Sequence, residues 1–145
     1  MRTTLTHPQT VAESLADNMC LACCYIFLAG QKADFPVNDA SCMSAVINCW
    51  REGLVDNECT CYAPEKMLKF LTGKSAVVTK IEDQQQIAKI LNSDEPCIAF
   101  YSIDGLNGHF VVMEHNKIIF NSLAKSKNVE KGTIHSLRRI QWRTN

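Results

Sequence analysis

The 145-residue chain lacks a net charge, a long apolar run and any low-complexity tract. Its 15 basic side chains are balanced by 15 acidic ones, whereas binding to nucleic-acid phosphates needs a surplus of Lys and Arg. The longest apolar run extends from Met19 to Ala29 and is shorter than the roughly 20 residues that a membrane-spanning helix needs. These absences exclude nucleic acid as the main partner and predict that no segment spans a membrane.

The first 18 residues also lack the apolar core of a secretory signal, because they are polar and contain Glu13 and Asp17. With 46% apolar and 21% charged residues, the composition is that of a soluble globular protein rather than a disordered or coiled-coil chain. There is no internal repeat or linker. We therefore expect a single domain over residues 1–145, located in the cytoplasm; nothing in the sequence indicates its oligomeric state.

Eight cysteines stand out against this ordinary composition. An even number is typical of disulfide frameworks in small secreted proteins, but this chain has no export signal and is long enough to fold around a hydrophobic core. Most of the cysteines are therefore interpreted as small, buried apolar residues. They are Cys20, Cys23, Cys24, Cys42, Cys49, Cys59, Cys61 and Cys97.

Helix signals dominate the first half of the chain. The segment Cys20–Gly30 is apolar on every side, which is typical of a central, buried helix. Asn18 is the expected N-cap of this helix and Gly30 its expected terminator. The other expected helices run from Asp39 or Ser41 to about Arg51, from Pro64 to just before Gly73, and from Glu82 to Asn92.

The second half is rich in short β-type runs separated by turn residues. Helices followed by an antiparallel sheet form the α+β pattern, so we expect N-terminal helices, with the buried helix packed on a C-terminal antiparallel sheet. The expected strands lie within Ser75–Ile81, Pro96–Tyr101, His109–His115, Lys117–Leu123 and Thr133–Trp142.

Cys20 is the cysteine best placed for chemistry. It opens the predicted buried helix, where the unpaired N–H groups and the helix dipole favour an anion. A thiol in this position has a lowered pKa and a larger thiolate fraction, as a nucleophile needs. Cys23 and Cys24 lie one turn further along, inside the core, and should be inert. The alternative is that Cys20 is one more buried core thiol.

A cysteine nucleophile needs a base and a group that orients the base. Among four histidines, His109 alone begins an apolar strand, directly after Gly108. If the next turn is a three-residue loop centred on His115, His109 lies opposite Asn121, whose carbonyl can accept the imidazole N–H. A two-residue loop would place Ser122 there instead.

The motifs CLACC (residues 20–24), GHFVVM (108–113) and FNSL (120–123) together resemble the papain-like cysteine peptidases. The resemblance runs from about Leu15 to the end, and is strongest to the compact bacteriocin-processing (double-glycine leader) peptidases and their uncharacterised bacterial relatives. It implies a papain-like fold in which Cys20 is the nucleophile, His109 the general base and Asn121 the orienting residue. Such a site needs no metal and no cofactor.

Two features depart from that family. Asn121-Ser122 replaces its Asp-Pro pair, and no Gln stands shortly before the cysteine to stabilise the oxyanion. Gln9 is too far upstream, so the side-chain amide of Asn18 and the backbone N–H of Cys20 are the candidate oxyanion donors. Losing one such donor costs on the order of 10²–10³ in rate.

Three functions remain open at this stage. The first is a thiol hydrolase that cleaves a peptide or other amide bond of a peptide or protein substrate through an acyl-enzyme. The second is an inactive or weakly active peptide-binding domain on the same fold. The third is a metal or redox protein, in which Cys20, Cys23 and Cys24 would act with Cys59 and Cys61.

Overall fold

The computed structural model describes residues 6–144. This part of the chain contains six helices and one five-stranded sheet, and every neighbouring pair of strands is antiparallel, so the expected α+β class is confirmed. The helices are α1 (Pro8–Asn18), α2 (Cys20–Ala33), α3 (Asp39–Arg51), α4 (Pro64–Thr72), α5 (Gln84–Leu91) and α6 (Lys127–Lys131). The strands are β1 (Ala76–Ile81), β2 (Cys97–Ser102), β3 (Gly108–Glu114), β4 (Lys117–Phe120) and β5 (Thr133–Trp142).

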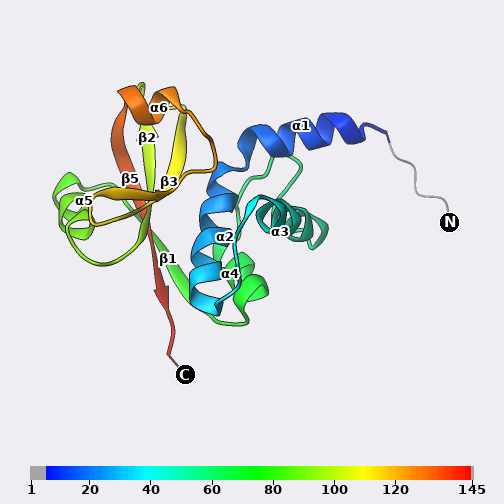
Figure 1. Cartoon of the computed structure of the whole chain (residues 1–145), viewed down its shortest axis with the longest axis horizontal. Helices are drawn as coiled ribbons and strands as arrows, with labels where there is room; N and C mark the ends of the chain where they lie inside the picture. Colours follow the sequence, from blue (N-terminus) through cyan, green and yellow to red (C-terminus); the bar gives the residue numbers. More distant parts are fainter. Residues whose placement is uncertain (1–5, 145) are drawn as a thin grey trace.

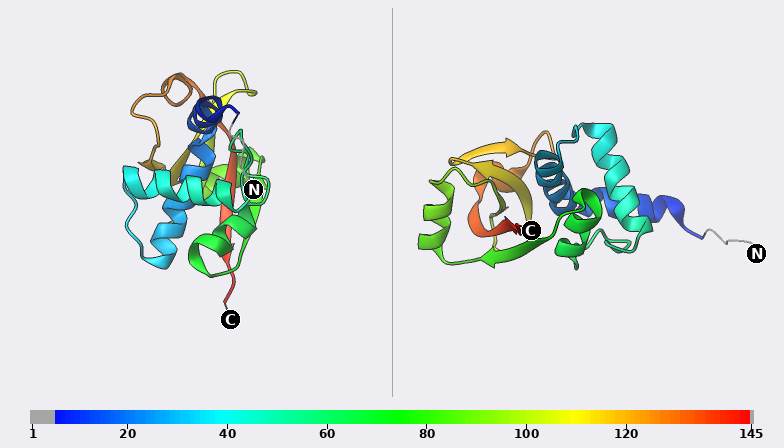
Figure 2. Two further views of the ribbon diagram at one scale, coloured as in Figure 1. Left: turned by 90° about the vertical axis from the view of Figure 1, so that its right-hand side faces the viewer. Right: turned by 90° about the horizontal axis from the view of Figure 1, so that it is seen from below.

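The strand order in the sheet is β1-β5-β2-β3-β4, so the last strand lies between the first and the second. Helix α2 stands between the sheet on one side and α3 and α4 on the other (Figure 1). Seen from below, the sheet and the first helices form two halves of an elongated molecule (Figure 2). Any residue at an end of α2 is therefore close to the boundary between the two halves.

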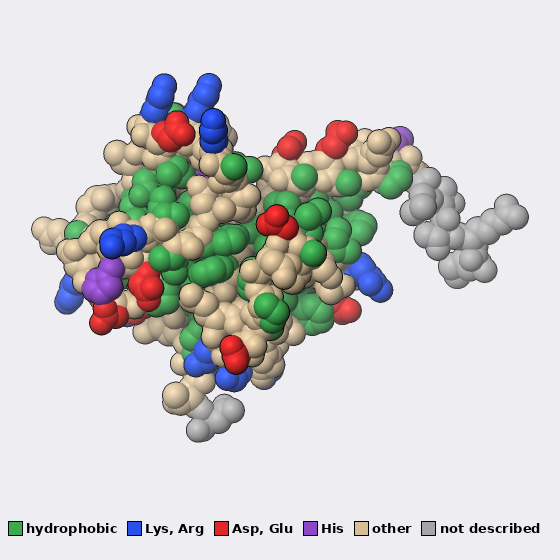
Figure 3. Space-filling view, viewed as in Figure 1, with side chains coloured by type: hydrophobic (Ala, Val, Ile, Leu, Met, Phe, Trp, Pro, Cys, Tyr) green, Lys and Arg blue, Asp and Glu red, His purple; other side chains and the backbone are tan. Residues whose placement is uncertain are grey.

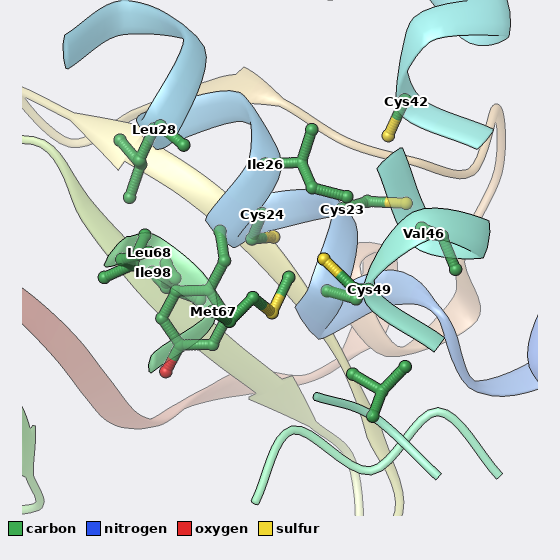
Figure 4. Close-up of a cluster of buried hydrophobic side chains, with 14 of the residues drawn as sticks. Cys23, Cys24, Ile26, Leu28, Cys42, Val46, Cys49, Met67, Leu68 and Ile98 are labelled. Carbon is green, nitrogen blue, oxygen red and sulfur yellow. The ribbon is translucent and has the colours of Figure 1, made fainter. Parts of the chain in front are cut away.

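Helix α2 is the centre of the larger hydrophobic cluster, as its all-round apolar sequence predicts. Cys24 and Ile26 are completely buried, and they pack together with Met67 and Leu68 of α4 (Figure 4). On the sheet side, Phe27 of α2 stacks on Phe120 of β4 with a distance of 4.8 Å between the ring centroids. This stacking holds α2 against β4, the strand that leads to Asn121.

The sheet is buried on both faces around β2 and β3. Ile98 belongs to the cluster around α2, whereas its neighbour Ala99 belongs to a second cluster, which includes Ile87 and Leu91 of α5. Successive residues of a strand point to opposite faces, so strands with both faces covered read as continuous apolar runs rather than as alternating ones. This explains the runs PCIAFY and HFVVM.

Helix α2 begins at Cys20, as expected, but its predicted N-cap and its predicted end are wrong. Asn18 is the last residue of α1, and Met19 takes the N-cap position with no side-chain cap. At the other end the helix continues past Gly30 to Ala33 and stops where Asp34 adopts a left-handed conformation with a φ of 58°. Gly30 is a helix residue that has no room for a side chain, because a Cβ atom there would collide with a side-chain methyl group of Val37.

The hairpin between β3 and β4 has a two-residue turn, His115–Asn116, and both turn residues have a positive φ. This geometry is typical of the tight turns that join twisted antiparallel strands. The three-residue loop is therefore wrong. A bulge shifts the register by one residue between Val112 and Met113, so neither simple hairpin register describes the end of the pair.

Helices α1 and α6 are absent from the elements expected from the sequence. In the part of the chain that the structure describes, no single helix is long and apolar enough to cross a membrane. Only α1 and α2 taken together reach that length and composition, and they are bent by 67° at the break between them.

Candidate active site

A cleft of about 560 Å³ opens where the beginning of α2 meets the ends of β3 and β4. Figure 3 shows hydrophobic side chains gathered where the two halves of the molecule meet. The charged or titratable lining side chains other than thiols are Asp17, Asp39 and His109, and no Lys or Arg among residues 6–144 lines the cleft. The remaining lining residues are Ala16, Met19, Cys20, Cys23, Val37, Asn38, Cys42, Met43, Gly108, Phe120, Asn121, Ser122, Leu123, Ser126 and Asn128.

Cys20 lies in this cleft as the first residue of α2, and its side chain is half-buried. Burial alone raises the pKa of a thiol, because it disfavours the charged form. Three contacts outweigh this effect: a hydrogen bond with His109, and hydrogen bonds from the backbones of Phe110 and Leu21. Together with the positive charge of the imidazolium, they hold the pKa of Cys20 below its ordinary value.

His109 is the second residue of β3 and is only 4% exposed. Gly108 precedes it at a point where no side chain fits, since a Cβ atom there would lie 2.7 Å from two ring atoms of Phe100. Burial lowers the pKa of the imidazole, but the hydrogen bonds with Cys20 and Asn121 and the charge of the Cys20 thiolate outweigh burial and raise it. The shifts of both groups thus favour a thiolate–imidazolium pair.

Asn121 follows the end of β4, and its Oδ1 lies 2.7 Å from Nε2 of His109. The same oxygen accepts a hydrogen bond from the backbone N–H of Leu123 at 3.0 Å. An amide oxygen only accepts hydrogen bonds, so Nε2 of His109 carries the proton and donates it. The other ring nitrogen, Nδ1, is left for Cys20.

The structure therefore brings Cys20, His109 and Asn121 together, although the register argument that suggested Asn121 does not hold. The two-residue turn on its own predicts Ser122 opposite His109. The strand ends at Phe120 after a bulge, and the chain that leaves it carries the Asn121 side chain to the histidine. Ser122 also lines the cleft but has no hydrogen bond with His109 among the described residues.

The structure does not bring Asn18 to this site. Its side-chain N–H donates to the carbonyl of Ser14 at 2.8 Å, and Asn18 is not among the residues that line the cleft. Gln9 lies exposed on α1, near the far end of that helix. The oxyanion donor that the geometry does offer is the backbone N–H of Cys20, because N–H groups of a first helical turn have no partner within the helix.

All eight cysteines are free thiols. Burial raises the pKa of Cys24 well above its ordinary value and that of Cys59 to about 11, so neither is a nucleophile at neutral pH. Cys59 and Cys61 are not joined as a disulfide. Within residues 6–144, no group of three His, Cys, Asp or Glu side chains is arranged to hold a metal ion.

Several cleft residues were not identified from the sequence. Asp17 belongs to α1, Asp39 and Met43 to α3, and Asn128 to α6. The two unexpected helices did carry signals. Pro8 stands at the first position of α1, and the side chain of Ser126 caps α6, features that mark helix starts.

The fold and the cleft together describe an α+β protein with a Cys-His-Asn site at the N-terminus of its buried helix. The chain belongs to the family described as "Protein of unknown function, DUF261", whose model matches residues 9–142. No curated protein and no solved structure matches it.

Proposed function

We propose that this protein is a papain-like thiol hydrolase that cleaves a peptide or other amide bond through an acyl-enzyme. The observation that supports the proposal is the hydrogen bond between His109 and Asn121 together with the position of Cys20 beside His109, at the N-terminus of a buried helix and inside a cleft. Nucleophile, base and orienting group stand in the order that covalent catalysis by a thiol requires.

In the proposed reaction, the Cys20 thiolate attacks the carbonyl carbon of the amide, and the backbone N–H of Cys20 donates to the resulting oxyanion. The His109 imidazolium then gives its Nδ1 proton to the leaving nitrogen, the C–N bond breaks, and a thioester and a free amine result. His109 next removes a proton from a water molecule, which attacks the thioester. The C–S bond of the thioester breaks, the acid is released, and the thiolate–imidazolium pair is restored. Asn121 holds the ring in the required tautomer throughout.

The cleft favours a peptide or protein segment as substrate. Met43 and Leu123 line it although their side chains are 60% and 51% exposed, so apolar surface is available to a partner. The carboxylates of Asp17 and Asp39, with no Lys or Arg in the lining, favour a positively charged group near the scissile bond. We place the reaction in the cytoplasm and assign it no metal and no cofactor.

A specific observation favours a second candidate, a peptide-binding domain on the same fold that does not cut its ligand. The related peptidases use a side-chain amide upstream of the cysteine, and here the amide of Asn18 donates to the Ser14 carbonyl instead. A site with one oxyanion donor fewer is expected to be about 10²–10³-fold slower. In this second candidate the cleft binds a peptide, but no amide bond is cleaved.

Trapping of the acyl-enzyme separates the two candidates. Wild-type protein is mixed with p-nitrophenyl acetate, quenched in acid and analysed by intact mass and peptide mapping. A hydrolase is expected to release a burst of nitrophenol and to carry one acetyl group on Cys20, both absent in Cys20→Ala and retained in Cys24→Ala. Slow release of nitrophenol with no acetyl group on Cys20, equal in the three proteins, would leave the binding domain as the function.

A further inference from the structure

Cys20 and Cys23 form a C-x-x-C pair at the start of a helix, and both line the cleft. The two thiols differ sharply in their surroundings. Cys20 is half-buried and in contact with His109, whereas Cys23 is 2% exposed. A reactive thiol followed, one turn later, by a sheltered one is the arrangement that dithiol chemistry uses.

A third thiol lies beside this pair. Cys42 of α3 also lines the cleft and lies beside Cys23, and the sticks in Figure 4 show the two side chains approaching one another from α2 and α3. The hydrogen bond with Cys42, followed by burial, raises the pKa of Cys23 above its ordinary value. Cys23 therefore stays protonated at neutral pH, and it lies one helical turn after Cys20.

We propose that this cleft is also a thiol–disulfide site, in which a hydroperoxide oxidises Cys20 and Cys23 resolves the product as a Cys20–Cys23 disulfide. This activity goes beyond amide hydrolysis and needs no acyl-enzyme.

The chemistry balances in two steps. The Cys20 thiolate attacks the terminal oxygen of the hydroperoxide, the O–O bond breaks, and His109 gives its proton to the departing alkoxide or hydroxide. Cys20 is then a sulfenic acid. The sulfur of Cys23 attacks the Cys20 sulfur, the S–O bond breaks, and the proton of Cys23 leaves with the hydroxide as water. Two thiols have lost two electrons in total, and the peroxide has gained them.

The geometry requires only a small adjustment. Side chains three residues apart on a helix have Cβ atoms about 5–6 Å from each other, and a disulfide needs about 3.5–4.5 Å. Cys20 is the first residue of its helix, so the N–H groups of its turn have no helical partners to lose. The backbone bond from Cys23 N–H to Met19 O, 2.9 Å long, spans the turn and can persist.

Peptide mapping distinguishes this disulfide from its competitor. Trypsin releases residues 3–32, which contain Cys20, Cys23 and Cys24, separately from residues 33–51, which contain Cys42 and Cys49. The protein is treated with hydrogen peroxide, blocked with N-ethylmaleimide and digested without reductant. We expect peptide 3–32 of the wild type to lack two hydrogens and to carry one maleimide, on Cys24. The same peptide from Cys24→Ala should also lack two hydrogens but should carry no maleimide.

Reversibility gives a second, independent readout. After peroxide, dithiothreitol should restore full alkylation of Cys20 in wild type and in the matched control Cys24→Ala. In Cys23→Ala the sulfenic acid has no resolving thiol and should proceed to sulfinic acid, with complete loss of recovery.

Three results would overturn the inference: peptide 3–32 cross-linked to peptide 33–51, sulfinic acid on Cys20 of the wild type with no disulfide, or no oxidation of Cys20. Any of them alongside normal acetylation of Cys20 by p-nitrophenyl acetate would leave the proposed hydrolase untouched. A Cys20–Cys23 disulfide without acetylation of Cys20 would instead support the thiol–disulfide site and contradict the proposed hydrolase.

Discussion

Replacing Asn121 by Ala tests whether the side chain beyond β4 stabilises the charged histidine. The change removes the acceptor that lies 2.7 Å from Nε2 of His109, an imidazole only 4% exposed. A hydrogen bond to a charged group contributes about 1.5–3 kcal/mol, equivalent to about 10- to 150-fold in the population of the thiolate–imidazolium pair. Asn121 is half-buried, so water replaces part of the lost acceptor, and the lower end, about 10-fold, is expected.

The assay is the second-order rate of alkylation of Cys20 by iodoacetamide at a pH just below neutrality. Asn121→Asp keeps an acceptor for both His109 and the Leu123 N–H, and should react at least as fast as wild type. Ser122→Ala is the matched control, since Ser122 also lines the cleft and is the residue that simple hairpin pairing places opposite His109. Equal slowing by Ser122→Ala, or no slowing by Asn121→Ala, would refute the reasoning.

Two further substitutions test neighbouring parts of the account. Gly108→Ala should cost about 3 kcal/mol or more in urea unfolding, because its Cβ atom would collide with the backbone carbonyl of Tyr101 and with the ring of Phe100. Gly53→Ala, in open space at a φ of 72°, should cost only about 1–2 kcal/mol, the cost of a left-handed conformation, and an equal cost at the two positions would contradict the collision. Asn18→Ala should leave the alkylation rate of Cys20 unchanged, because the Asn18 amide donates within α1, whereas a marked slowing would restore Asn18 to the site.

The sequence predicted most of the elements because their signals are local. The all-round apolar character of α2, Pro64 and Gly73 around α4, and the β-rich runs of the sheet each depend on residues near one another in the chain. The position of β5 between β1 and β2 has no local signal. It depends on pairing between segments more than 30 residues apart in the chain, such as Ser102 with Thr133 and Ala76 with Trp142.

Of the candidate site, Cys20 and His109 were identified from helix-end electrostatics and from the strand that follows Gly108. Asn121 was suggested by a hairpin register with a three-residue loop, whereas the structure has a two-residue turn and a bulge. A bulge depends on packing against the rest of the fold, so it cannot be predicted from the hairpin sequence alone. Asn18 was suggested as an oxyanion donor because it carries a side-chain amide just before Cys20, and it was also the expected helix cap, but the chain places it inside the preceding helix. Where a single residue separates the end of one helix from the start of the next, capping signals are ambiguous.

The measurement that tests the central claim most directly is the pH dependence of alkylation at Cys20, by iodoacetamide and peptide mapping, in wild type and in His109→Ala. Hydrogen bonds from His109 and from the backbone lower the pKa of Cys20, so its reaction should persist at pH values where Cys24 and Cys59 are silent, and should decline only as the pH falls through that lowered pKa. Loss of His109 should move the decline to higher pH. A Cys20 that is as slow as Cys24, or whose profile is indifferent to His109, would contradict the account.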